Sequence, residues 1–135
     1  MNFKVLITDG IAKNGLDILN RYPEIEVTLK KETPLEELKK IIGDYDAIII
    51  RSATKLTANL IDLAHSMKLI VRAGTGVDNI DVARATQKKI PVMNTASANS
   101  LAAAEQTIAL MFAVLRNVAQ EIGRASCRER VCQYV

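Results

Sequence analysis

One short segment combines an arginine with two closely spaced glycines, in a pattern that could bind an anion. This segment is Arg72-Ala-Gly-Thr-Gly76. Gly74 and Gly76 would let the backbone approach a ligand closely, and successive N–H groups there could cradle a carboxylate or a phosphate. A second arginine, Arg51, offers another planar and permanently charged guanidinium for the same anion. From these residues alone, an anion site and a plain glycine turn with surface arginines are equally good interpretations.

The surrounding sequence alternates between strand and helix patterns. Apolar, β-branched runs predict strands over 3–8, 24–29, 47–50, 69–71 and 90–93. Helical spacing and helix start signals predict helices over 15–22, 33–43, 57–64 and 80–87. Thr33, Pro34 and Glu36 are expected to form a capping box at the second helix. This order predicts an α/β fold of the flavodoxin-like class, with a doubly wound, parallel five-stranded sheet.

In such a sheet, ligands bind in the crevice beyond the carboxyl ends of the strands. The chain leaves the last three predicted strands through Arg51-Ser-Ala-Thr54, Arg72-Ala-Gly-Thr-Gly76 and Asn94-Thr-Ala-Ser97. The candidate site is therefore expected where these three loops meet. No cluster of His, Asp and Glu in the sequence predicts a metal site.

Two other functions of similar folds lack residues that they require. A dinucleotide fingerprint that began at Gly74-Thr-Gly76 would need glycine at Asn79 and an acidic residue near Asn94. A phospho-receiver domain would need an acceptor aspartate at the end of the third strand, where Arg51 stands. Neither function is therefore expected of this chain.

Composition excludes further classes of function. The chain has 135 residues, 49% hydrophobic and 24% charged, with a net charge of +3 and no basic stripe, so no nucleic-acid partner is expected. No apolar run is long enough for a membrane span, and the N-terminus leads directly into a strand pattern, which predicts a cytoplasmic protein without a membrane partner. Cys127 and Cys132 lie in the last nine residues, so the rest of the chain has no disulfide framework.

The loops, taken together, resemble the D-isomer-specific 2-hydroxyacid dehydrogenase family, most closely its phosphoglycerate-specific members. The resemblance rests, in matching order and spacing, on Ile50-Arg-Ser-Ala-Thr-Lys-Leu-Thr57, Val71-Arg-Ala-Gly-Thr-Gly-Val-Asp-Asn-Ile80, Val92-Met-Asn-Thr95 and Asn99-Ser-Leu-Ala-Ala-Ala-Glu105. It implies reversible hydride transfer between NAD and the 2-hydroxyl carbon of 3-phosphoglycerate, a step of serine biosynthesis. Intact members of the family are usually homodimers or homotetramers.

The resemblance also implies roles for single residues. Backbone N–H groups of Ala73, Gly74, Thr75 and Gly76 would hold the substrate carboxylate, and Thr75 would also lie near the nicotinamide. Arg51 and Arg72 would help to bind the negative groups of the substrate. No catalytic residue is assigned in this chain, because the family's histidine–glutamate pair, its arginine and its G-x-G-x-x-G element lie beyond residue 135.

The same resemblance predicts the domain organisation. Residues 1–97 would be the first part of a substrate-binding domain, and 98–120 a long helix that crosses to a missing Rossmann domain and begins it. Asn99, Ser100 and Glu105 would lie at the start of this helix, beside the active-site cleft. The helix, expected over 100–119, is so apolar that it must pack on a large surface.

Residues 121–135 are expected to be a non-native tail. They contain three arginines, no lysine and no helix or strand period, and they resemble a translated sequencing adapter. An ordinary divergent C-terminus is the alternative.

The chain alone is expected to be inactive. The competing hypotheses are a standalone anion-binding module of flavodoxin-like fold and a non-functional truncated product.

Overall fold

A computed structural model describes residues 2–31 and 33–118 of the chain. The chain divides into a first unit that ends at Ala98 and a second unit that begins at Asn99. The two units are described separately. The first contains the whole sheet and all the loops of the candidate site.

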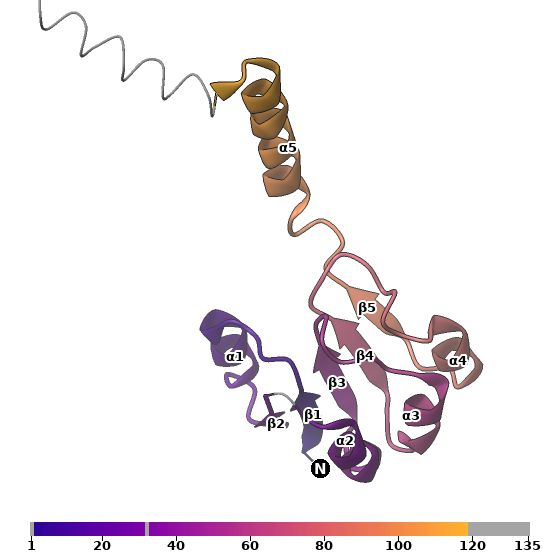
Figure 1. Ribbon diagram of the computed structural model, residues 1–135. Helices are drawn as coiled ribbons and strands as arrows, with labels where there is room; N and C mark the ends of the chain where they lie inside the picture. The colour runs from indigo at the N-terminus through magenta and orange to yellow at the C-terminus, as the bar shows by residue number, and fades with distance from the viewer. Residues whose placement is uncertain (1, 32, 119–135) are drawn as a thin grey trace, which may run out of the picture. The chain divides into compact units, whose positions relative to one another are not determined.

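The first unit is a five-stranded parallel sheet in the order β2-β1-β3-β4-β5 (Figure 1). Its strands are β1 (Phe3–Ile7), β2 (Ile25–Leu29), β3 (Ala47–Ile50), β4 (Leu69–Arg72) and β5 (Val92–Asn94). The helices between them are α1 (Lys13–Leu19), α2 (Leu35–Ile41), α3 (Ala58–Leu63) and α4 (Val82–Gln87), with a short 3-10 helix η1 (Ile42–Asp44) after α2. This arrangement confirms the predicted flavodoxin-like α/β sheet.

The alternation of apolar side chains along the strands builds a core on each face of the sheet. In β1, Leu6 belongs to one core, while Val5 and Ile7 belong to the other. The larger core also contains Leu38 of α2, Ile61 of α3 and Ala85 of α4, whereas the smaller one is covered by α1. Helices therefore pack on both faces, as a doubly wound sheet requires, and ligands of such sheets bind beyond the carboxyl ends of the strands.

The predicted capping box at the start of α2 is wrong. The cap position is Pro34, with φ −58° and ψ 146°, and no side chain caps the helix. Because Pro34 takes the cap position in an extended conformation, Thr33 lies one residue too early, and its buried Oγ1 has no hydrogen-bond partner within 2–31 and 33–118. Glu36 instead accepts a hydrogen bond from Lys39 Nζ at 2.7 Å. A cap that the sequence analysis missed is Asp81, which accepts a hydrogen bond from the Arg84 N–H at 2.9 Å at the start of α4.

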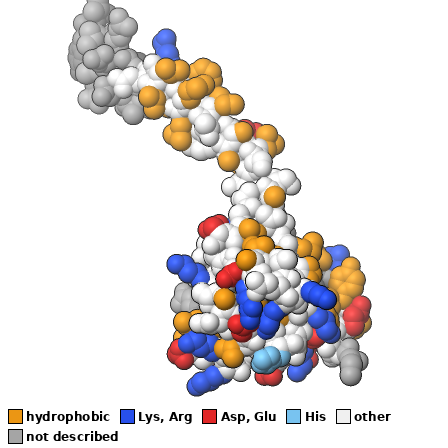
Figure 2. All heavy atoms as spheres, turned by 90° about the vertical axis from the view of Figure 1, so that its right-hand side faces the viewer, with side chains coloured by type: hydrophobic (Ala, Val, Ile, Leu, Met, Phe, Trp, Pro, Cys, Tyr) orange, Lys and Arg blue, Asp and Glu red, His pale blue; other side chains and the backbone are white. Residues whose placement is uncertain are grey.

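The described part of the second unit is one long helix, α5 (Ser100–Leu115). It ends four residues before the predicted end at Ala119, which lies outside the described residues; after it Asn117 adopts a left-handed φ of 50°. None of its residues is buried, and Figure 2 shows hydrophobic side chains along its visible side. Among the described residues, no helix is both long and apolar enough to cross a membrane. The predicted non-native tail, 121–135, also lies outside the described residues.

Candidate anion-binding site

The three loops singled out from the sequence come together at the carboxyl edge of the sheet. We call residues 51–54 the arginine loop and residues 73–76 the glycine loop. The Ala73 N–H donates to the carbonyl of Ile50 at 2.9 Å, which joins the start of the glycine loop to the end of β3. On its other side, the Thr95 N–H donates to the Gly74 carbonyl at 3.0 Å, and Asn94 Nδ2 donates to the Thr75 carbonyl at 2.6 Å. The glycine loop is therefore held between its two neighbours.

Arg72, the last residue of β4, folds its side chain back over the glycine loop. Its side chain is only 11% exposed, and its Nη1 donates to Asp78 Oδ1 at 2.8 Å. Its Nε is buried and has no hydrogen-bond partner among the described residues. The guanidinium thus lies against the loop with one nitrogen paired and one left unsatisfied, which is a costly arrangement for a buried charged group.

The backbone of the glycine loop adds further donors beside this charge. Within the described chain, the N–H groups of Thr75 and Gly76 donate no hydrogen bond, and both residues are exposed. Two successive free N–H groups next to a guanidinium form an electropositive patch suited to a carboxylate or phosphate oxygen. This geometry favours an anion site over a plain glycine turn.

The arginine loop is organised by Asp9, which lies just beyond the end of β1. The Asp9 carboxylate accepts hydrogen bonds from the Arg51 N–H at 2.7 Å, the Thr54 N–H at 3.1 Å and the Thr54 hydroxyl. Burial raises the pKa of Asp9, but the hydrogen bonds from Thr54, Arg51 and Ala53 outweigh it, so that the pKa lies below its ordinary value. No local sequence pattern points to these contacts, which join residues 42 and 45 positions apart. The side chain of Arg51 itself is exposed.

Asn79 holds the arginine loop from the opposite side. Its Nδ2 donates to the carbonyls of Arg51 and Thr54, at 2.7 Å each. Its own carbonyl accepts from the Leu56 N–H at 2.9 Å, beside a parallel bridge between Leu56 and Ile80. Asn79 follows the glycine loop by three residues, so it couples the two loops directly. In the sequence, Asn79 only argues against a dinucleotide fingerprint, and no local pattern points to its partners.

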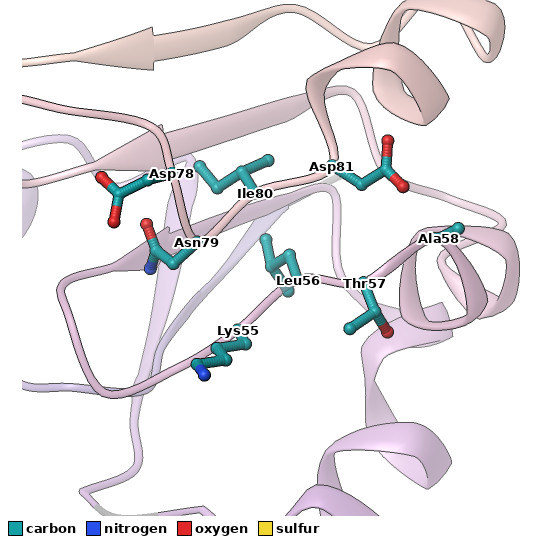
Figure 3. A pocket seen from close by; sticks show the side chains of 8 residues that line it. All are labelled: Lys55, Leu56, Thr57, Ala58, Asp78, Asn79, Ile80 and Asp81. Atoms are coloured by element: carbon teal, nitrogen blue, oxygen red, sulfur yellow. The ribbon is translucent and has the colours of Figure 1, made fainter.

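A pocket of about 290 Å³ lies beside the Leu56–Ile80 bridge rather than at the electropositive patch (Figure 3). The side chains of Leu56 and Ile80 lie on neighbouring segments, while those of Lys55 and Asp81 point away from each other. The lining residues include neither Arg51 nor Arg72 nor any residue of the glycine loop, although Asp78, the partner of Arg72, and Asn79, which holds the arginine loop, are among them. The concentration of donors and positive charge therefore locates the candidate site better than the shape of the surface does.

The remaining candidate residues belong to the second unit. Asn99, Ser100 and Glu105 lie at the start of α5, where all three are exposed and Asn99 makes no side-chain cap. Their predicted place beside the cleft stays a prediction. Within residues 2–31 and 33–118, no group of three or more His, Cys, Asp and Glu residues could hold a metal ion.

The two glycines of the loop should differ in their tolerance of a side chain. A Cβ on Gly76 would lie 2.7 Å from Asp78 Oδ1 and 3.0 Å from Arg72 Nη1, whereas a Cβ on Gly74 would lie 3.5 Å from Arg72 Nε, which is an ordinary contact. We expect Gly76→Ala to displace the Arg72–Asp78 ion pair at a stability loss below about 1 kcal/mol, because flexible side-chain ends can move aside. Gly74→Ala is the control and should preserve the pair. Backbone NMR shifts and urea unfolding would test this; a larger disturbance by Gly74→Ala would contradict it.

Comparison of this chain with known proteins identifies the family that it resembles. Residues 5–135 match the family model described as D-isomer specific 2-hydroxyacid dehydrogenase, catalytic domain. D-3-phosphoglycerate dehydrogenase of Synechocystis sp. is 44% identical over 115 residues, which are 85% of this chain and 20% of that protein. Hydroxypyruvate reductase of Thermotoga maritima is 40% identical over 118 residues, 87% of this chain and 38% of that protein.

Solved structures agree with the sequence comparison. The NAD+-bound 3-phosphoglycerate dehydrogenase of Entamoeba histolytica matches with a TM-score of 0.70 and 31% identity, over 84% of this chain and 39% of that one. The chain spans only about a fifth of the length of the D-3-phosphoglycerate dehydrogenases of Synechocystis sp. and Methanocaldococcus jannaschii. The family model covers nearly the whole chain and confirms the resemblance carried by the three loops. The chain belongs to the D-isomer specific 2-hydroxyacid dehydrogenase family.

Proposed function

We propose that this chain supplies the substrate-anion site of an NAD-dependent dehydrogenase that oxidises 3-phosphoglycerate to 3-phosphohydroxypyruvate in serine biosynthesis. The observation that carries the proposal is the pair of free N–H groups on Thr75 and Gly76, beside the guanidinium of Arg72. The similarity to D-3-phosphoglycerate dehydrogenases in both sequence and structure supports the choice of substrate. The enzyme is proposed to be a cytoplasmic homodimer or homotetramer.

The role proposed for these residues is to bind and orient the substrate. The N–H groups of the glycine loop would hold the carboxylate, and Arg72 and the exposed Arg51 would neutralise the negative groups of the substrate. Fixing both charged ends restricts the orientation of the hydroxyl-bearing carbon between them, which lowers the entropic part of the barrier. NAD, when bound, accepts the hydride, and the exposed Thr75 is the residue of this chain that we place beside the nicotinamide.

The domain boundaries are part of the same proposal. Residues 1–97 would form the first part of the substrate-binding domain, and 98–120 the crossing helix and the start of the cofactor domain. The division of the chain after Ala98 supports this boundary. Residues 121–135 would be a non-native tail, and the 135-residue chain alone would be inactive.

The activity can be tested in a chimera. Residues 3–118 of this chain would replace the matched segment of the Synechocystis enzyme, which supplies the rest of the protein. We expect NAD reduction with 3-phosphoglycerate, and a loss of kcat/KM of about 100-fold on Arg72→Gln, since a charge-assisted hydrogen bond to the substrate is removed. The control is Arg21→Gln, at an exposed position that is distant in sequence from these loops.

A folded chimera that binds NAD but oxidises no 3-phosphoglycerate would contradict the proposal. Activity on hydroxypyruvate alone would instead favour the function named for the Thermotoga maritima relative. Anion binding by the chain, with no turnover in the chimera, would favour a standalone anion-binding module.

A further inference from the structure

The ion pair between Arg72 and Asp78 joins two groups with very different exposure. The Arg72 side chain is 11% exposed, whereas that of Asp78 is 82% exposed, and they meet at 2.8 Å. The arginine is thus held under the loop surface, while its partner carboxylate stands almost entirely in solvent. Exposed ion pairs of this kind are weak, because solvent screens the attraction and hydrates the freed carboxylate.

The Asp78 carboxylate also lies directly against the glycine loop. The Cβ position of Gly76 is 2.7 Å from Asp78 Oδ1 and 3.0 Å from Arg72 Nη1. A carboxylate of the chain therefore already touches the guanidinium beside the two free N–H groups of Thr75 and Gly76. This is the same combination of donors that the proposed function gives to an anionic group of the substrate.

We propose that Asp78 is an internal counter-ion of Arg72, which an anionic group of the substrate displaces when it binds, so that Asp78 sets the affinity of the site. The inference rests on the proposed function only in taking the ligand to be a small organic anion. Asp78 acts through Arg72 and does not itself touch the substrate.

Displacement follows from the charges and from the unequal burial. One guanidinium cannot neutralise two anions, and the group that leaves is the exposed one, since Asp78 can turn into water while Arg72 stays packed over the loop. Its own backbone N–H and the charge of Arg72 lower the pKa of Asp78, so the carboxylate remains ionised and competes at neutral pH.

Displacement makes a quantitative prediction that repulsion does not. If Asp78 must leave Arg72 before any anion binds, every anion is weakened by the same factor, whatever its charge. If Asp78 stayed in place and only repelled the ligand, a phosphate dianion would be weakened more than a monoanion. The two mechanisms therefore separate in a comparison between ligands.

The test uses the full 135-residue chain and follows the amide signals of Thr75 and Gly76 by NMR. The probes are 3-phosphoglycerate, D-glycerate and inorganic phosphate, titrated at constant ionic strength. We expect Asp78→Asn to lower Kd by about 3- to 10-fold, by the same factor for every probe that binds, because a weak internal competitor is removed. Asp78→Glu, which keeps the charge, should restore much of the wild-type Kd.

Matched controls separate this effect from a general change of charge. Asp62→Asn removes the same charge and breaks another ion pair, that with Arg84 Nη2 at 2.6 Å, and should leave Kd within about twofold. In an Arg72→Gln background, Asp78→Asn should no longer lower Kd. A gain in affinity cannot arise from a damaged fold, and Asp78→Ser is a second charge-removing variant if Asp78→Asn does not fold.

Several results would overturn the inference. They are an unchanged or higher Kd in Asp78→Asn, a gain that grows with the charge of the probe, and an absence of anion binding in every variant. Its failure can be told apart from a failure of the proposed function, which is judged by turnover in the chimera. Tighter anion binding together with an inactive chimera would leave the internal counter-ion standing and remove the dehydrogenase proposal.

Discussion

Replacing Asp9 with alanine is expected to lower the free energy of unfolding by about 2 to 4 kcal/mol and to release the arginine loop. The Arg51 and Thr54 N–H groups donate to this one carboxylate, as does the Thr54 hydroxyl. Removing the shared acceptor leaves several donors unpaired at once, and these bonds are strengthened by the carboxylate charge. Urea unfolding would measure the loss, and amide hydrogen exchange at residues 51–54 would show the release.

The pH dependence of the same contribution has a definite sign. Because hydrogen bonds outweigh burial and hold the pKa of Asp9 below its ordinary value, its stabilising effect is complete above that ordinary value. It is lost as the pH falls through the lowered pKa of the folded state. The stability difference between wild type and Asp9→Asn should therefore shrink on acidification. Asn14→Ala, at an exposed position on α1 that has no ionisable side chain, is the control and should show no such trend. A difference that stays constant with pH would contradict this account.

Replacing Asn79 with alanine should be the second largest change, at about 2 to 3 kcal/mol of stability together with weaker anion binding. Its Nδ2 is shared by the carbonyls of Arg51 and Thr54, at 2.7 Å each, and no other side chain in the described ranges donates to them. Losing the amide removes two hydrogen bonds that couple the arginine loop to the segment after the glycine loop, so the backbone of Arg51 and Thr54 is held less firmly. In the chimera, we expect KM for 3-phosphoglycerate to rise about 10-fold, with a smaller change in kcat.

The donor character of Asn79 can be tested by an isosteric change. Asn79→Asp keeps the shape but turns acceptor oxygens toward two carbonyls, so it should be at least as damaging as alanine. Asn59→Ala, at an exposed position on α3, is the matched control and should change stability by less than about 0.5 kcal/mol. Wild-type KM in Asn79→Ala would show that the coupling of the loops has no part in binding.

The sheet could be predicted from the sequence because its signals are local. Continuous apolar runs such as Ala47–Ile50, with turn residues between them, depend only on near neighbours, and all five strands were found within one or two residues at each end. The same local reasoning failed at Thr33, where the backbone of Pro34 moved the helix start by one residue. Local sequence patterns thus predict the helices and strands, while the capping residue at a helix end depends on the backbone conformation there.

The supports of the candidate site could not be predicted in this way. Arg51, Arg72 and the glycine loop are recognisable by residue type alone, because arginine and glycine have distinct chemistry. Asp9 reaches residues 42 and 45 positions away, and Asn79 reaches residues 25 and 28 positions away. Such pairs become visible only when strand order is known, and one sequence does not reveal it.

The long sequence separations between these hydrogen-bonded residues also affect how the site forms during folding. Asp9 follows β1 and the arginine loop follows β3, and these two strands pair in parallel in the middle of the sheet. Contacts between residues so far apart carry a large loop-closure entropy and form slowly. The anion site should therefore assemble late, after β1, β3 and β4 have docked in register. It follows that no peptide excised from this chain can keep the whole site unless it runs from Asp9 to Asn94.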